Sequence, residues 1–271
     1  ITRELLACGA DIVEMNTIRK RLSRVKAGRF AQHCAPARVF SIVLSDIVGD
    51  PLDMIASGPA YPDTSTAEQA REIVKKYALH LSDEALSCLE APTPNHLSNA
   101  ETHITGSVRA LCAAAQDAAQ KLGFQCRMLT DCLDCEAREA GRFLASIARS
   151  HQQTERPLAF FAGGETVVHL TGQGLGGRNQ ELALAAAPGL RGTQNTAVCS
   201  FGSDGTDGPT DAAGGFVDQS SDAALRAAGL DVPQVLAEND AYHALQKIGG
   251  LLMTGPTGTN VNDLAMVLIW R

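Results

Sequence analysis

The sequence predicts an α/β protein built from two domains. Between residues 107 and 201, short apolar runs of strand character alternate with helix-like stretches, a pattern of βαβ units that favours a mostly parallel or mixed sheet. The length of 271 residues exceeds what one ordinary domain needs. The proline-containing segment at residues 91–95 interrupts the pattern, so we expect one domain over residues 1–95 and a second over residues 96–271.

Each predicted element has its own supporting pattern. Apolar residues at helical spacing indicate the helices, and Ser65 or Thr66 offers a side-chain cap to the helix that follows it. Short runs rich in β-branched and aromatic residues, bounded by glycine or polar residues, indicate the strands. In chain order we expect a helix over residues 4–25, a strand over 38–44, helices over 66–77 and 107–122, a strand over 124–129, a helix over 136–149, strands over 158–162 and 166–171, a helix over 182–187, and strands over 196–201 and 251–253.

The composition is that of a globular protein without a strong positive field. Hydrophobic residues make up 45% of the chain, and the net charge of −7 offers no attraction to nucleic acid or to an anionic membrane. No apolar stretch is long enough to span a membrane and no signal peptide is visible, so we expect neither partner. The eight cysteines have no regular spacing, and Cys132-Leu-Asp-Cys135 lacks a second metal-binding pair, which favours a reduced, cytoplasmic protein over a disulfide framework or a zinc site.

A glycine-rich loop at residues 172–181 is the most informative local motif, because it lies between a strand-like and a helix-like run. Glycines allow the backbone to approach an anion closely, and the start of the following helix adds a favourable field. Arg178 follows the glycines, where its guanidinium can grip a phosphate or a carboxylate through two parallel bonds. A plain strand-to-helix connection is the alternative interpretation of this spacing.

Two more loops of this kind follow, at residues 202–215 and 254–263, each after an apolar strand-like run. We therefore expect all three loops to open at one edge of a sheet, where ligands of open α/β folds bind. Each aspartate beside a glycine in these loops can also simply close a turn. The carboxylates available to hold Mg²⁺ or to accept a proton are Asp46, Asp50, Glu165, Asp204, Asp207 and Asp211.

The sequence lacks the Walker A, nucleophile-elbow, zinc-protease and EF-hand patterns, which leaves two enzyme classes for the glycine loop. A nicotinamide-dependent dehydrogenase fits the glycine spacing, but it predicts an acidic residue closing the next strand and small apolar residues at positions 178–181. Phosphoryl transfer needs an arginine, backbone donors and carboxylates, which the loops supply. Lys26, close to a glycine and ahead of a strand, is a further candidate contact for an anion, with a solvated surface lysine as the alternative.

Six motifs in order along the chain resemble those of the class II glycerate kinases (glycerate 2-kinases). The carboxyl-terminal portion of these proteins is the MOFRL domain, and members are often labelled hydroxypyruvate reductases. The motifs are residues 5–29, residues 45–63, GGETVV at 163–168, GLGGRNQELAL at 174–184, DGTDGPTDAAG at 204–214 and TGPTGTNVND at 254–263. So many loop motifs in a fixed order identify the chain as a member of this family.

The resemblance implies ATP-dependent phosphorylation of D-glycerate to 2-phosphoglycerate, with Mg²⁺, in a cleft between a Rossmann-like α/β/α amino-terminal domain and a MOFRL-containing α/β domain. Residues 1–95 would then be the carboxyl-side portion of the Rossmann-like domain. On the motif match, Arg178 stabilises the transferring phosphoryl group or holds the glycerate carboxylate, and Asp46 is a candidate base or metal partner. The candidate Mg²⁺ ligands are Asp204 and Asp207, and the candidate contacts to substrate or nucleotide are Lys26, Ser45, Ser57, Gly58, Glu165, Gly174, Gly176, Gly177, Asn179, Thr257, Thr259 and Asn260.

Members of this family usually carry a further amino-terminal portion with a Gly-Lys-Ala type segment, whose lysine is given a catalytic role. Nothing in this sequence matches that segment, so we expect the chain to be the remainder of a longer protein. Two alternatives to the kinase stay open: an NAD(P)H-dependent hydroxypyruvate reductase, and a non-catalytic remnant that binds a sugar acid or a nucleotide. The sequence also leaves the assembly open, with a homodimer as one option.

Overall fold

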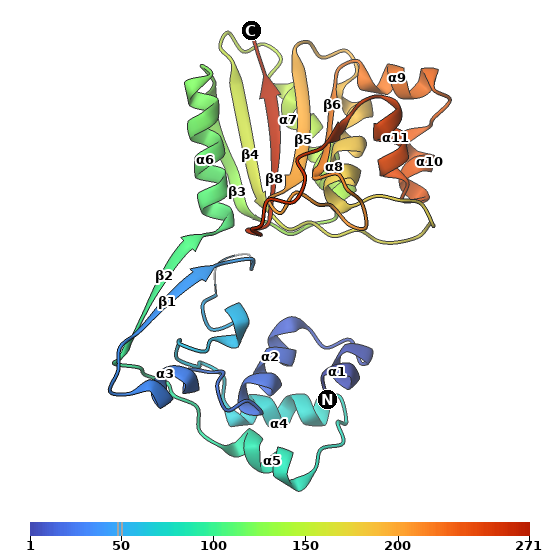
Figure 1. The fold of residues 1–271 in the computed structure, drawn as a ribbon. Helices are drawn as coiled ribbons and strands as arrows, with labels where there is room; N and C mark the ends of the chain where they lie inside the picture. The colour runs from blue at the N-terminus through green and yellow to red at the C-terminus, as the bar shows by residue number, and fades with distance from the viewer. Residues whose placement is uncertain (48, 50) are drawn as a thin grey trace. The chain divides into compact units, whose positions relative to one another are not determined.

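The computed structural model describes residues 1–47, 49 and 51–271, which fall into two compact units (Figure 1). Unit 1 consists of Ile1–Val43 with Asp50–Thr105, and unit 2 consists of Leu44–Gly49 with Gly106–Arg271. The division between residues 95 and 96 stays a prediction about the domains, and Asp50 lies outside the described residues.

Unit 1 is mainly helical, and apolar side chains of four of its helices form its core. Its elements, with the last residues of both strands counted in unit 2, are α1 (Thr2–Ala7), α2 (Ile12–Arg21), α3 (Arg29–Cys34), β1 (Val39–Leu44), the 3₁₀ helix η1 (Ile55–Ser57), α4 (Ala67–Lys76), α5 (Asp83–Glu90) and β2 (Ala100–Gly106). The core residues are Leu5, Ala10, Met15, Ile18, Ala70, Ile73, Leu79 and Leu89.

The single helix predicted over residues 4–25 is two helices in the structure, because Gly9 ends the first. Its φ of +75° is the left-handed conformation that commonly follows a helix. Asp11 then begins α2 through a capping box with Glu14. The predicted cap at Thr66 is confirmed, since its Oγ1 accepts a bond from the N–H of Gln69 at 3.1 Å.

The strand predicted over residues 38–44 is confirmed as β1, and it forms a two-stranded sheet with β2, which the sequence analysis did not predict. No further strand occurs in the described part of unit 1, so a Rossmann-like sheet is not seen within it. Along β1, alternate side chains are exposed, namely Phe40, Ile42 and Leu44.

Unit 2 is built on a six-stranded mixed sheet, which confirms the α/β class. The strand order is β3-β4-β8-β5-β6-β7. Among the pairs of described strands, only β3 and β4 are parallel, and β8 returns between β4 and β5 in the opposite direction. The sequence predicted a mostly parallel or mixed sheet, and the sheet is mixed. The elements are α6 (Val108–Lys121), β3 (Gln125–Leu133), α7 (Ala137–Ser150), β4 (Leu158–Gly164), α8 (Arg178–Ala186), the 3₁₀ helix η2 (Ala187–Leu190), β5 (Thr196–Gly202), β6 (Gly214–Asp218), α9 (Ser221–Ala227), α10 (Val232–Ala237), α11 (Ala241–Lys247), β7 (Leu251–Leu252) and β8 (Asp263–Ile269).

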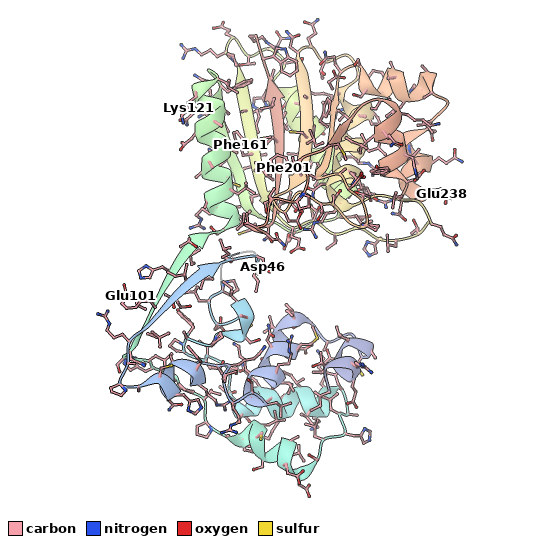
Figure 2. The ribbon with its side chains drawn as sticks, viewed as in Figure 1. Asp46, Glu101, Lys121, Phe161, Phe201 and Glu238 are labelled. Atoms are coloured by element: carbon pink, nitrogen blue, oxygen red, sulfur yellow. The ribbon has the colours of Figure 1, made fainter. Side chains whose placement is uncertain are left out.

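Helices cover both faces of this sheet (Figure 1). On one face, Val108 and Cys112 of α6 belong to a cluster with Phe161 of β4, which Figure 2 labels. On the other face, α7, α8 and η2 contribute to the larger core. All seven residues of β4 are buried, as expected for a strand covered on both sides.

Two local predictions need correction. Residues 166–171 were predicted as a strand, but the chain leaves the sheet at Gly164 and keeps only an isolated bridge between Val167 and Glu136. The helix predicted over residues 182–187 begins earlier, at Arg178. Within the residues that the structure describes, no helix combines the length and the apolar character needed to cross a membrane.

Candidate active site

Three loops meet at one edge of the sheet in unit 2. The pairing register aligns Gly164, the last residue of β4, and Gly202, the last residue of β5, with Asp263, the first residue of β8. The loops that follow β4 and β5 therefore open beside the loop that precedes β8. This arrangement confirms the expectation that the three glycine-rich loops share one edge.

Arg178 extends from the start of α8 and is held by two carboxylates. Its Nε and Nη2 donate to the two carboxylate oxygens of Asp263 at 2.5 and 3.1 Å, and its Nη1 donates to Glu165 Oε1 at 2.7 Å. Burial acts to lower the pKa of the guanidinium, but the bonds and charges of Asp263 and Glu165 outweigh burial and raise it. The side chain keeps 32% of its surface exposed, and three bonds leave N–H groups for a further acceptor.

The three residues after Arg178 are buried, and each has a partner inside unit 2. These partners come from a strand, a loop and a neighbouring helix, so they anchor the start of α8 on several sides. The bonds run from Ser200 Oγ to Asn179 Oδ1 at 2.5 Å, from Gln180 Nε2 to Thr210 Oγ1 at 2.8 Å, and from Arg138 Nε to Glu181 Oε1 at 3.1 Å. Asn179, predicted as a ligand contact, therefore turns its side chain into the protein interior.

Asp207, on the loop after β5, caps α8 because the N-cap residue Gly177 has no side chain to do so. Its Oδ1 accepts a bond from the N–H of Asn179 at 3.1 Å, and its Oδ2 accepts one from the N–H of Gln180 at 2.9 Å. Burial raises the pKa of Asp207 to about 6, although these bonds oppose the shift. Asp207 thus fixes the helix start from which Arg178 extends.

Most backbone donors of the first glycine-rich loop are used within unit 2. The N–H groups of residues 171, 172, 174 and 175 donate to acceptors in residues 238–240 at 2.8–3.0 Å. Gly174 therefore uses its N–H inside the protein. The N–H groups of Gly176 and Gly177 therefore stay the predicted backbone donors to an anion.

Close packing explains the glycines of this loop better than unusual backbone angles do. A Cβ on Gly174 would lie 2.5 Å from the Cβ of Asp240, and one on Gly177 would lie 2.3 Å from the Cγ of Asp207. A Cβ on Gly176 would meet its nearest neighbour, Ala241, at 3.3 Å. The glycine pattern thus lets the loop lie directly against the segments that hold it.

Asp204 and Asp207 differ in how well they fit Mg²⁺. Both oxygens of Asp207 face the N–H donors of α8, so this carboxylate does not fit a metal ligand. Asp204 Oδ1 accepts a bond from the N–H of Thr206 at 2.9 Å, and no bond within the described residues engages its Oδ2. Across that part of the chain, no three His, Cys, Asp or Glu side chains gather to hold a metal. Mg²⁺ commonly binds through one or two carboxylates together with substrate phosphates, so the carboxylate of Asp204 fits the role of a Mg²⁺ ligand.

The loop before β8 is tied to the loop after β5. The N–H of Thr257 donates to Asp204 O at 3.0 Å, and its Oγ1 donates to Ser203 O at 2.6 Å. These bonds set the position of one loop against the other. Thr257, Thr259 and Asn260 are exposed at this edge and stay candidate contacts for a ligand.

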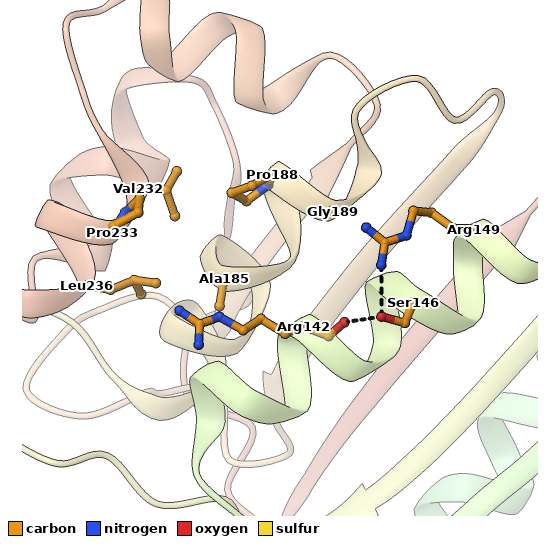
Figure 3. Close-up of a pocket in the computed structure, with 9 residues that line it drawn as sticks. All are labelled: Arg142, Ser146, Arg149, Ala185, Pro188, Gly189, Val232, Pro233 and Leu236. Atoms are coloured by element: carbon orange, nitrogen blue, oxygen red, sulfur yellow. Dashed lines mark hydrogen bonds between the residues drawn. The ribbon is translucent and has the colours of Figure 1, made fainter.

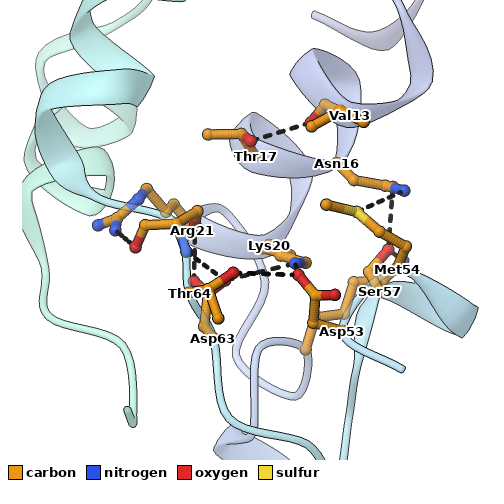
Figure 4. A network of polar contacts seen from close by, with 12 residues as sticks. Val13, Asn16, Thr17, Lys20, Arg21, Asp53, Met54, Ser57, Asp63 and Thr64 are labelled. Atoms are coloured by element: carbon orange, nitrogen blue, oxygen red, sulfur yellow. Dashed lines mark hydrogen bonds and ion pairs between the residues drawn. The ribbon is translucent and has the colours of Figure 1, made fainter. Parts of the chain in front are cut away.

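The candidates Lys26, Ser57 and Gly58 lie in unit 1, where Figure 4 shows Ser57 close to Asn16. Lys26 Nζ donates to Ser57 Oγ at 3.1 Å, and Ser57 Oγ donates to Asn16 Oδ1 at 3.1 Å. Gly58 has a left-handed φ of +59°, and a Cβ there would lie 3.0 Å from Asp53 O. The structure thus brings Lys26 and Ser57 together.

Ser45 and Asp46 lie just after β1, in the short segment of unit 2. Ser45 is buried, and its N–H donates to Gly106 O at 2.8 Å while its Oγ donates to Ile47 O at 3.3 Å. Asp46 is exposed, and its carboxylate has no bond within the described residues. Of the two, Asp46 is the residue with unused acceptors.

Sequence reasoning missed three residues that organise these sites: Asp263, Ser200 and Lys20. Asp263 carries a readable signal, because it ends a loop motif directly before the apolar run at residues 264–269. Ser200 lies inside an apolar strand and carries no such signal. Lys20 is fully buried on α2, where it forms ion pairs with Asp53 and Asp63 at 2.9 and 3.3 Å.

A separate pocket of about 270 Å³ lies against the carboxyl-terminal end of α8 (Figure 3). Arg149 Nη2 donates to Ser146 Oγ there at 3.1 Å. None of the lining residues belongs to the three loops, so this pocket is distinct from the candidate active site. The lining residues are Arg142, Ser146, Arg149, Ala185, Pro188, Gly189, Val232, Pro233 and Leu236.

Comparisons with known proteins agree on the family. The MOFRL family matches residues 158–263, and a domain of unknown function (DUF4147) matches residues 1–90. A D-glycerate 2-kinase from Thermotoga maritima is 54% identical over 273 residues, covering 99% of this chain and 66% of the relative. A glycerate kinase from Macaca fascicularis is 35% identical, and the match covers 99% of this chain and 82% of that relative.

A solved structure leads to the same conclusion. The crystal structure of a glycerate kinase from Thermotoga maritima matches with a TM-score of 0.95, covering 99% of this chain and 66% of that one. The chain thus spans 66% and 63% of the lengths of the first two curated relatives. Two relatives from Agrobacterium vitis carry a hydroxypyruvate reductase name, as the resemblance led us to expect. The chain belongs to the glycerate 2-kinase family, with the MOFRL domain in its carboxyl-terminal part.

Proposed function

We propose that the protein phosphorylates D-glycerate to 2-phosphoglycerate, using ATP and Mg²⁺. The proposal rests mainly on the position of Arg178. Glu165 and Asp263 hold its guanidinium at the edge that the three loops share, and some of its N–H groups stay available to an anion. The family supports it, because the relatives from Thermotoga maritima and Macaca fascicularis are named a D-glycerate 2-kinase and a glycerate kinase.

Phosphoryl transfer depends mainly on positioning and on neutralising the charge that spreads over the transferred group. Arg178 supplies a guanidinium in a fixed place, because Asp263 receives two of its bonds and Asp207 holds the start of its helix. Its remaining N–H groups would donate to phosphoryl oxygens or to the glycerate carboxylate. Asp46, with its exposed and unpaired carboxylate among the described residues, is the candidate base for the glycerate hydroxyl.

Asp204 would hold Mg²⁺ through its free Oδ2, together with the nucleotide phosphates. The metal ion would supply positive charge to the oxygens between which the phosphoryl group moves. Thr257, Thr259 and Asn260 would contact substrate or nucleotide from the loop before β8, where their side chains are exposed.

We place this activity in the cytoplasm. All eight cysteines are free in the structure, which is the state that a reducing compartment preserves.

The proposal is tested by supplying the purified protein with D-glycerate and Mg-ATP and, separately, with hydroxypyruvate and NADH. We expect ADP release that depends on glycerate, and phosphorus NMR of the product should show 2-phosphoglycerate. NADH oxidation without ADP release would establish the reductase instead. Binding of glycerate or ATP without either turnover would establish a non-catalytic binding protein.

A further inference from the structure

Lys26 in unit 1 is a partly buried cation whose only partner among the described residues is neutral. Its Nζ donates to Ser57 Oγ at 3.1 Å. Lys20, six positions before Lys26 in the sequence, shows the contrasting case, since its ammonium lies between the carboxylates of Asp53 and Asp63. A buried ammonium normally has such a carboxylate partner. The positive charge of Lys26 therefore lacks a compensating negative charge among the described residues.

A second cation adds to this imbalance. Arg19, on α2, is partly buried, and its guanidinium has neither a hydrogen bond nor an ion pair with any described residue. Burial first, and then the charge of Arg19, lower the pKa of Lys26, so the two cations oppose each other. An anion between them would relieve both effects.

Of the two neutral residues beside Lys26, Asn16 has unused donor capacity, whereas the Ser57 hydroxyl already donates to Asn16 Oδ1. Asn16 and Ser57 are 4% and 3% exposed. Asn16 Nδ2 has only the weak thioether acceptor of Met54, at 3.8 Å, as Figure 4 shows. Asn16 lies three residues before Arg19 on α2, so the two side chains share one face of that helix.

The backbone holds Ser57 firmly in an uncommon conformation. Ala56, Ser57 and Gly58 are consecutive left-handed residues, with φ values of 50°, 61° and 59°. Two bonds fix this segment, from Ala27 N–H to Ser57 O and from Gly28 N–H to Gly58 O, at 3.0 and 2.7 Å. Left-handed non-glycine residues are uncommon, and such strained residues cluster at active sites and ligand sites.

We infer that Asn16, Arg19, Lys26 and Ser57 form an oxyanion site in unit 1, which takes the carboxylate or the phosphate group of a small molecule. Arg19 and Lys26 supply the charge, and Asn16 and Ser57 supply fixed polar atoms beside it. The inference rests on the proposed function only for the identity of the anion, which would be the glycerate carboxylate or a phosphate of the nucleotide.

The test is isothermal titration of the 271-residue chain with inorganic phosphate and, separately, with D-glycerate, at constant ionic strength. The variants are Arg19→Gln and Lys26→Gln, and the control is Arg24→Gln, an exposed residue of the same unit with the same change of charge. We expect binding at least about tenfold weaker in the two site variants and unchanged in the control, because each loses a charge-assisted bond. Thermal unfolding checks that each variant folds.

The two ligands identify the anion. Binding of phosphate alone assigns the site to a phosphoryl group, and binding of glycerate alone assigns it to a carboxylate. No binding of either ligand, or equal binding by all variants, would overturn the inference. Turnover is measured separately, so a protein that lacks glycerate-dependent ADP release but binds phosphate through Arg19 and Lys26 would reject the proposed function and keep the oxyanion site.

Discussion

In unit 2, the proposed ligand binding and the support of helix α8 fall to different side chains, which the sequence alone could not distinguish. Arg178 keeps donors free at the loop edge, whereas Asp207, which looked like a metal ligand, uses its oxygens to hold the start of α8. An aspartate in a glycine-rich loop fits both tasks in sequence. Only the position of its acceptors decides between them.

The titration of Asp207 gives a prediction at this scale. Its pKa is raised from 3.8 to about 6, so the folded state binds the proton more tightly than the unfolded chain does. Compared with Asp207→Asn, the free energy of unfolding of the wild type should therefore increase as the pH falls from about 6 to about 4, by up to about 3 kcal/mol. Urea denaturation at several pH values measures this difference. A decrease over the same range would show that the helix start lowers the pKa of Asp207 instead.

Helix α8 is the element on which the candidate active site depends. Its first residue carries the guanidinium, and the next three are anchored to β5, to the loop after β5 and to α7. The loop before it packs so closely that side chains would not fit at several positions. The placement of Arg178 is thus a property of the helix and its surroundings.

Two neighbouring glycines test this account of α8. In Gly177→Ala, the new Cβ would lie 2.3 Å from the Cγ of Asp207, so the cap must move; we expect a loss of roughly 2 kcal/mol or more in unfolding free energy and lower activity. Gly176→Ala is the matched comparison, and we expect a smaller effect, because its Cβ would lie 3.3 Å from Ala241, a tight contact that a small shift relieves. Chemical denaturation and the ADP-release assay measure both variants. Equal effects would mean that the cap does not control the helix start.

Patterns local in sequence predicted many elements but not their partners. The apolar strands β4 and β5 and the cap of α4 could be predicted because each depends on nearby residues. The direction of β8 could not be predicted, since strand pairing joins segments far apart in the chain. The same holds for the candidate active site, where the bond from Arg178 to Asp263 spans 85 positions.

At the scale of the whole molecule, each unit has its own stabilising centre. The apolar cluster of unit 1 shares no residue with the two clusters of unit 2. Unit 1 also contains a buried charged group, in which Lys20 lies between Asp53 and Asp63. Although burial opposes ionisation, bonds from Ser65 and the charge of Lys20 keep the pKa of Asp63 below its ordinary value.

Removing Lys20 should destabilise unit 1 selectively. Lys20→Met leaves two carboxylates without their cation, and breaking such a buried pair typically costs about 3–5 kcal/mol. Lys76→Met, which removes an exposed ion pair with Glu14, is the control and should change little. Hydrogen exchange followed by mass spectrometry should show lost protection in peptides of residues 1–43 and 51–105. An equal loss across residues 106–271 would show that the two units unfold as one.

The central claim is that Arg178 acts on the transferred phosphoryl group or the glycerate carboxylate, and one pair of variants tests it most directly. Arg178→Lys keeps the positive charge but loses the planar fork that bonds Asp263, while Arg149→Lys makes the same change in the separate pocket. We predict that kcat for glycerate-dependent ADP release falls about 100-fold or more in Arg178→Lys and is unchanged in Arg149→Lys. An unchanged kcat in Arg178→Lys, with the protein folded, would contradict this account.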